Sequence, residues 1–207
     1  MKDSLHILLT VEQWYLFAFM VLYFGLVLGV RTLILYWRTG INPFQKFGRR
    51  SDHSLAERMI PIAVCLLLII AGNYFFLPSN IKYLLPFYFL DHILLKHLGL
   101  AFCVIGLLCT FIAQLQMKDS WRIGLDQDNE IELVDQGLFS YSRNPIYVAL
   151  MMAYFGVFLI VPGAFSLVFV LLKGIAINRK VKDEERFLEN KLGAEFLDYK
   201  NRVRRWF

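Results

Sequence analysis

The sequence predicts an all-α, polytopic integral membrane protein with about five transmembrane helices and a C-terminal amphipathic helix, in one membrane domain over residues 1–207. Hydrophobic residues make up 57% of the chain and charged residues only 19%, and the mean hydropathy is +0.51. The apolar residues fall in long blocks, whereas a surface helix of a soluble protein shows them as a stripe at every third or fourth position. Such blocks are typical of helices that cross a bilayer.

Charge and ligand spacing exclude other classes of protein. The formal net charge is +5, but the basic residues flank the apolar blocks, which indicates orientation in a membrane rather than binding to nucleic acid. The cysteines lie inside apolar blocks without paired spacing, and the histidines lack metal-ligand spacing, so neither disulfides nor a metal is expected. These residues are Cys65, Cys103, Cys109, His6, His53, His92 and His97.

Three apolar blocks predict the first three spans. Residues 14–37 are bounded by tryptophans that suit the two membrane interfaces, and at 1.5 Å per residue they cover roughly 36 Å. This block lacks a basic leader and a small-residue cleavage site, so we expect an anchor rather than a signal peptide. After a basic loop, the second span is expected at residues 59–77, where Pro78 ends it. The third is expected at residues 92–117.

A polar segment over residues 118–143 precedes a predicted helical hairpin. Spans four and five are expected at residues 146–161 and 164–178, with Pro162-Gly163 as the turn. Both spans are short for a hydrocarbon core of roughly 30 Å. We therefore expect the first to begin at Pro145 and the second to continue as helix beyond the membrane.

The distribution of Lys and Arg predicts the orientation. The loop between spans one and two, the polar segment and the C-terminal tail carry most of the 22 basic residues. By the positive-inside rule the N-terminus faces outward, and the C-terminus is cytoplasmic. The polar segment and the tail are then expected on the same side of the membrane.

The start of the predicted hairpin has two residues that favour a helix N-terminus. Asn144 can accept hydrogen bonds from the first free backbone N–H groups, and Pro145 at the first helical position needs no N–H. A helix N-terminus beside Arg143 is also a candidate anion site.

The tail over residues 179–206 predicts an amphipathic helix. Its apolar residues recur at steps of four, four, three, four and three, which is one helical face. Gly193 would cost about 1 kcal/mol relative to Ala, so a break there is compatible with the pattern. Either the helix lies on the membrane surface, or it folds back over the polar segment and closes a pocket. The face comprises Leu188, Leu192, Phe196, Tyr199, Val203 and Trp206.

Two segments carry a resemblance to a known family. The first reads Glu132-Leu-Val-Asp-Gln-Gly-Leu-Phe-Ser-Tyr-Ser-Arg143-Asn144-Pro145-Ile-Tyr147, and the second has Glu184-Glu185-x-x-Leu188, followed by Gly193-x-x-Phe196-x-x-Tyr199-x-x-x-Val203. This pattern resembles the isoprenylcysteine carboxyl methyltransferases, and phospholipid N-methyltransferases share much of it. The resemblance covers about the last 90 residues, so 118–207 is expected to form the methyltransferase-like part behind three N-terminal helices over 1–117.

The resemblance implies an enzyme that uses S-adenosylmethionine, with the cofactor pocket on the cytoplasmic side. By position it implies catalytic roles for Arg143 and Glu185 and substrate binding by Arg179 or Lys180. The cofactor-binding positions would be Leu133, Val134, Phe139, Asn144, Pro145, Tyr147 and Glu184.

Asn144 stands where the carboxyl methyltransferases have His, and it cannot titrate. Methyl transfer from a sulfonium is an in-line displacement, and a carboxylate acceptor needs no deprotonation at pH 7. Positioning alone can lower the barrier by roughly 7–11 kcal/mol. An amine acceptor would need a proton acceptor, for which Glu184 or Glu185 could serve.

The sequence therefore predicts a membrane methyltransferase of a lipid-like or isoprenoid small molecule with a carboxyl, amine or hydroxyl acceptor. The substrate would enter from the bilayer among membrane lipids, and neither nucleic acid nor metal would take part. Two alternatives stay open. One is a sterol-reductase-like enzyme whose NADPH phosphates would bind Arg122, Arg143 and the basic tail. The other is a non-catalytic membrane scaffold with the tail helix as its docking surface.

Overall fold

The computed structural model describes residues 55–117 and 133–206, together with seven separate positions between Trp14 and Trp37. Most of the first predicted span, residues 38–54 of the basic loop after it and residues 118–132 with Arg122 lie outside the described residues.

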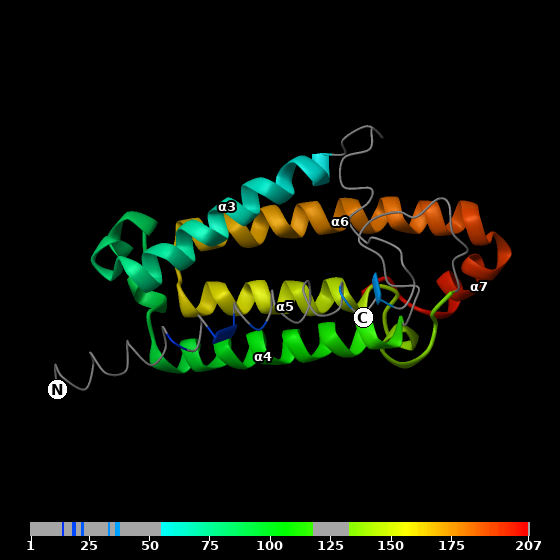
Figure 1. Ribbon diagram of the computed structural model, residues 1–207, viewed down its shortest axis with the longest axis horizontal. Helices are drawn as coiled ribbons and strands as arrows, with labels where there is room; N and C mark the ends of the chain where they lie inside the picture. Colours follow the sequence, from blue (N-terminus) through cyan, green and yellow to red (C-terminus); the bar gives the residue numbers. More distant parts are fainter. Residues whose placement is uncertain are drawn as a thin grey trace.

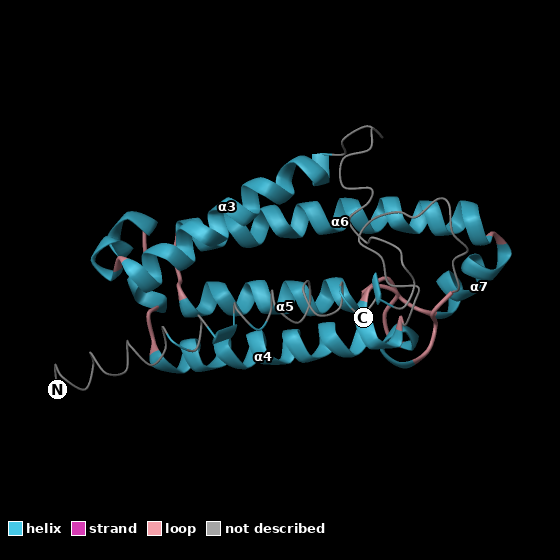
Figure 2. Ribbon diagram, in the orientation of Figure 1, coloured by secondary structure: helices cyan, strands magenta, loops and turns pink. Residues whose placement is uncertain are grey.

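The described part of the chain is all-helical and contains no strand, which confirms the predicted fold class at that level (Figure 2). Its long helices coincide with the predicted apolar blocks. They are α3 (Leu55–Phe76), α4 (Ile93–Gln116), α5 (Pro145–Ile160) and α6 (Ala164–Leu192), followed by α7 (Ala194–Arg202). Short 3₁₀ turns connect them: η2 (Pro78–Leu84), η3 (Tyr88–Leu90) and η5 (Gly137–Ser140).

Among the described helices, α4 alone is both long and apolar enough to cross a membrane. The apolar parts of α3 and α5 are shorter, over Cys65–Phe76 and Pro145–Ile160. Helix α6 has 29 residues in one continuous helix, so the predicted continuation beyond residue 178 is confirmed.

The four long helices form two pairs, α3 on α6 and α4 on α5, that lie roughly along one axis (Figure 1). The tight turn between α5 and α6 lies at one end, and α7 lies at the other, beside the start of α5. This arrangement brings the two segments that carry the family resemblance to the same end of the molecule.

Small residues let α4 and α5 approach closely. A Cβ atom added to Gly99 would lie 2.6 Å from the carbonyl oxygen of Gly156, and one added to Gly156 would lie 2.5 Å from that of Gly99. Two turns on, a Cβ on Gly106 would lie 2.6 Å from the carbonyl oxygen of Ala149. Small residues at such spacing are the usual means of packing helices in membranes, where apolar side chains gain little by leaving the lipid.

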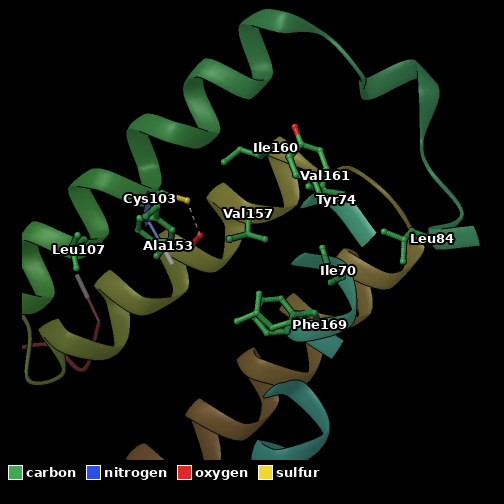
Figure 3. Packing of buried hydrophobic residues seen from close by; sticks show 12 residues of the cluster. Ile70, Tyr74, Leu84, Cys103, Leu107, Ala153, Val157, Ile160, Val161 and Phe169 are labelled. Carbon is green, nitrogen blue, oxygen red and sulfur yellow. Dashed lines mark hydrogen bonds between the residues drawn. The ribbon is translucent and has the colours of Figure 1, made fainter. Parts of the chain in front are cut away.

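The predicted Pro162-Gly163 turn is confirmed, and it is fastened by hydrogen bonds. Ser166 Oγ donates to the carbonyl of Val161 at 2.6 Å and accepts from Gly163 N at 3.1 Å. The carbonyl of Pro162 also accepts from Phe87 N at 2.9 Å. Beside the turn, Ile70, Tyr74, Val157 and Phe169 meet in the apolar core (Figure 3).

The tail differs from a single surface helix. The chain turns at Gly193, whose φ is 57°, and α7 folds back. The predicted apolar face is real on both sides of this break, because Phe196, Tyr199 and Val203 are buried together and contact Leu188, Leu192 and Leu133. These contacts fit the interpretation in which the tail folds back over the end of the polar segment, at Leu133, and the closing of a pocket there stays a prediction.

Gly156→Ala is expected to destabilise the protein by about 1–3 kcal/mol, because the added methyl group meets a backbone oxygen of α4 that no rotamer change can move. The measurement is the midpoint of thermal unfolding in neutral detergent. Gly72→Ala is the matched control, since a Cβ at Gly72 meets nothing within 4 Å. Equal midpoints for the two variants would contradict the close contact between α4 and α5.

Candidate functional site

Arg143, at the start of α5, joins three segments of the chain. Its Nε and Nη2 atoms donate to Glu185 Oε1 on α6 at 3.1 and 3.0 Å. Its Nη1 atom donates to the carbonyl of Lys200 on α7 at 3.0 Å and to that of Val203. The Arg143 side chain is only 8% exposed, so this cluster is buried.

Glu185 receives a second guanidinium from the C-terminal segment. Arg205 Nε lies 3.1 and 3.0 Å from the two carboxylate oxygens, and Arg205 Nη2 lies 2.5 Å from Oε2. Burial by itself would raise the pKa of Glu185, but the hydrogen bonds from Arg205 and Arg143 outweigh it and hold the pKa below its usual value. Glu185 is therefore an ionised group whose oxygens are already bonded.

Asn144 occupies the predicted N-cap position, but its side chain makes no capping bond, so that part of the prediction is wrong. Its Nδ2 atom instead donates to the carbonyl of Arg205 at 3.2 Å and points at Glu185 Oε1 at 3.4 Å. Ser142 Oγ donates to the same Arg205 carbonyl at 3.1 Å. The amide is used by the C-terminal segment, while Pro145 still starts the helix as predicted.

The anion expected beside this helix start is present as a side chain of the protein itself. The carboxylate of Glu185 fills the space in front of the Arg143 guanidinium. Binding of a cofactor carboxylate by Arg143 remains a prediction, and its guanidinium already has three internal acceptors in Glu185, Lys200 and Val203.

Glu184, the neighbouring glutamate, faces a different environment. The Tyr147 hydroxyl donates to Glu184 Oε1 at 2.7 Å, and Lys180 Nζ lies 4.0 Å from the same oxygen. No donor among the described residues contacts Glu184 Oε2, and the side chain remains 27% exposed. Burial raises the pKa of Glu184, and the charge of Lys180 and the bond from Tyr147 offset only part of this effect.

The two glutamates thus differ in the way that often separates catalytic from structural carboxyl groups. Glu185 has a lowered pKa and saturated oxygens, whereas Glu184 has a raised pKa and one open oxygen. Their side chains leave α6 on different faces because adjacent residues on a helix are about 100° apart.

The other predicted cofactor positions lie around this end of the fold. Leu133 packs against the buried face of α7, and Val134 beside it is half-buried. Phe139 is buried, and its carbonyl accepts from the Tyr199 hydroxyl at 2.7 Å. Pro145 is buried at the first position of α5.

Of the two predicted substrate-binding residues, Lys180 lies in the site and Arg179 lies outside it. Lys180 Nζ lies 6.0 Å above the centroid of the Tyr147 ring, close to Glu184. Arg179 is exposed and forms no hydrogen bond or ion pair with any described residue.

The contacts of two residues of this region were not predicted from the sequence. Arg205 was expected only as part of the basic tail that would bind phosphate in the reductase alternative, and no local pattern predicts its contact with Glu185. Lys173 interrupts the apolar part of α6, and a single cation in an apolar block is a signal that could have found it.

Glu185→Gln is expected to cost about 3–5 kcal/mol of stability, because it leaves two arginines at a buried site without their counter-charge. Thermal unfolding in detergent measures the change. Glu189→Gln is the matched control, since Glu189 pairs with Lys200 where both side chains are more than a third exposed, and exposed pairs contribute about 0–1 kcal/mol.

The same carboxylate predicts an acid-dependent loss of stability. A lowered folded-state pKa contributes stability that is present above the unfolded pKa of about 4.3 and is lost as the pH falls through the folded pKa. Unfolding midpoints measured between pH 7 and pH 3 should fall in the wild type and vary less in Glu185→Gln. Parallel pH profiles for the two proteins would refute this assignment.

This chain is similar to known methyltransferases in sequence and in fold. Residues 95–195 match the family model of phospholipid methyltransferases. The fold is similar to the solved structure of the eukaryotic intramembrane Ras methyltransferase ICMT, an isoprenylcysteine carboxyl methyltransferase. The two chains share 21% identity and a TM-score of 0.54, over 88% of this chain and 65% of that chain. No curated protein sequence matches this chain.

The resemblance predicted from the two motifs is confirmed. The match covers somewhat less than two thirds of the length of the solved carboxyl methyltransferase.

Proposed function

Given that confirmed resemblance to membrane methyltransferases, we propose that this protein transfers a methyl group from S-adenosylmethionine to a lipid-like or isoprenoid small molecule. The observation that carries the proposal is the 2.7 Å bond between Tyr147 and Glu184. It joins the two motifs of the resemblance, which lie on different helices, into one polar site.

The residues of this site suit S-adenosylmethionine, which carries a sulfonium, an ammonium, a carboxylate and an adenine ring. The open oxygen of Glu184 suits its cationic groups. Leu133 and Val134 form no backbone hydrogen bond within the described part of the chain, so their N–H and C=O groups are available to the adenine.

When bound, this cofactor supplies a methyl group activated by the sulfonium. The chain then has to align the acceptor with that methyl group and exclude water. A carboxylate acceptor is already ionised at pH 7, whereas an amine acceptor needs a proton acceptor. Glu184 suits that role better than Glu185, because a raised pKa lies closer to neutrality.

The catalytic roles predicted for Arg143 and Glu185 remain predictions, and their contacts favour positioning over direct chemistry. Together with Arg205 they hold the C-terminal segment against the start of α5. Asn144 belongs to the same network and cannot act as a base. The proposed enzyme therefore relies on alignment at this wall and on Glu184 for any proton transfer.

The proposal includes the predicted topology. Five spans would place the N-terminus outside and the cofactor site on the cytoplasmic side, where the basic tail lies. An acceptor dissolved in the bilayer would reach the site sideways between helices, and the water-soluble cofactor would enter from the cytoplasm.

Calorimetric titration of the detergent-purified protein separates this proposal from its two rivals. We expect S-adenosylmethionine to bind and NADPH not to bind, because the Arg143 guanidinium that a cofactor phosphate would need is held by Glu185 and two carbonyls. Binding of NADPH alone would favour a reductase. If neither ligand binds, the scaffold becomes the better account.

Glu184→Gln is expected to weaken S-adenosylmethionine binding at least about tenfold, which corresponds to about 1.4 kcal/mol, because it removes the charge that faces the cationic cofactor. Calorimetry measures the affinity, and an unchanged unfolding midpoint shows that the fold is intact. Asp183→Asn is the matched control: it removes the same charge at the preceding position, where the carboxylate faces Arg186 at the surface. Equal affinities for both variants would make Glu184 an ordinary surface charge.

A further inference from the structure

A lysine lies in the apolar part of α6 with no acidic partner among the described residues. Lys173 is the tenth residue of the helix, so its Cα lies roughly 13–14 Å along the axis from Ala164. The helix presents apolar side chains outward around it, with Leu171 56% and Ile175 47% exposed. A cation at such a position is costly in a bilayer and usually marks a functional contact.

The contacts of Lys173 leave its charge uncompensated. In the described part of the chain its ammonium meets no carboxylate, and the charged group that acts on it is Lys180, which has the same sign. Lys173 Nζ instead lies 5.4 Å from the centroid of the Tyr154 ring. That ring is held in place by Phe169, whose centroid lies 5.1 Å away in a T-shaped arrangement.

The arrangement repeats two turns further along α6. Lys180 Nζ lies 6.0 Å above the Tyr147 ring, so two Lys–Tyr pairs follow one another on the facing sides of α5 and α6. Seven residues separate the lysines, which is roughly 10 Å along the helix. The second pair adjoins Glu184, and the first lies deeper in the apolar region.

Lys173 is half-buried, and beside it a Cβ added to Gly174 would be in ordinary van der Waals contact with the Met151 methyl group, at 3.5 Å. The aromatic ring orients the ammonium from one side and offers no acceptor that could replace an anion.

We propose that Lys173, oriented by Tyr154, binds an anionic oxygen group, a carboxylate or a phosphate, of an amphiphile in the bilayer. Lys180 provides the next cation along the path toward Glu184. The inference rests on the proposed function, because it assigns the acceptor to acidic amphiphiles. It disfavours neutral and purely cationic lipids, which gain nothing from two successive ammonium groups.

The test uses the full chain in neutral maltoside detergent and three probes with one hexadecyl-length tail. Hexadecanoate, hexadecyl phosphate and hexadecanol differ only in the headgroup, and calorimetry measures their affinities. We expect at least one anionic probe to bind about tenfold or more tightly than the alcohol. Lys173→Met should remove the difference, and Lys173→Arg should retain most of it.

Lys182→Met is the matched control, because Lys182 is an exposed lysine on the same helix that faces neither tyrosine. Tighter binding of hexadecanoate would identify a carboxylate ligand, and tighter binding of hexadecyl phosphate a phosphate ligand. Equal affinity for all three probes, or an anionic preference that survives Lys173→Met and Lys173→Gln, would overturn the proposal. Lys173 would then only extend its ammonium toward the interface.

Titration of S-adenosylmethionine into the same samples keeps the two proposals separate. Lys173→Met should bind the cofactor as the wild type does, since Lys173 lies on the acceptor path. Absence of cofactor binding in the wild type would refute the methyltransferase proposal while leaving the headgroup preference as an independent result.

Discussion

The carboxylate of Glu185 is the contact on which the candidate site depends. It accepts hydrogen bonds from Arg143 at the start of α5 and from Arg205 in the C-terminal segment, and it is 6% exposed. Burying a charge is expensive unless it is paired and fully bonded. Two guanidiniums around one carboxylate leave an excess positive charge, which the carbonyls of Lys200 and Val203 at the end of α7 help to offset.

This cluster explains why the neighbouring glutamate can have a different role. Because Glu185 holds the C-terminal segment in place, Glu184 is left facing Tyr147 and Lys180 with one oxygen open. Glu185 stabilises the fold, whereas Glu184, one position earlier on the same helix, has a raised pKa at a partly exposed site. A methyltransferase needs both kinds of group: a fixed wall against which reactants are aligned, and a chemically available side chain beside it.

The helices also differ in what they contribute to the site. Helices α4 and α5 pack closely at Gly99 and Gly156, and this pair supports the residues at the start of α5. Helix α6 extends from the apolar region to Glu184 and Glu185, and along the way it presents Lys173 and Lys180 to tyrosines of α5. A continuous helix therefore connects the apolar part of the molecule to its polar end.

The sequence by itself determined the elements and their order. Apolar blocks, Pro78, Pro145 and Pro162-Gly163 predicted where helices lie and end, because hydrophobic length and proline geometry act locally along the chain. The spacing of apolar residues in the tail predicted the face whose members Phe196, Tyr199 and Val203 are buried, and the spacing of the two motifs predicted the family.

Only the tertiary structure decided how the polar groups are shared. The Asn144 amide was expected to cap its own helix, yet it bonds to Arg205, which is 61 positions away. Glu184 and Glu185 look equivalent in sequence and differ only through their neighbours in space. Arg205 has no local signal at all, because an ion pair depends on which segments the fold brings together, and a hydrogen-bond partner across such a distance leaves no periodic mark in the sequence.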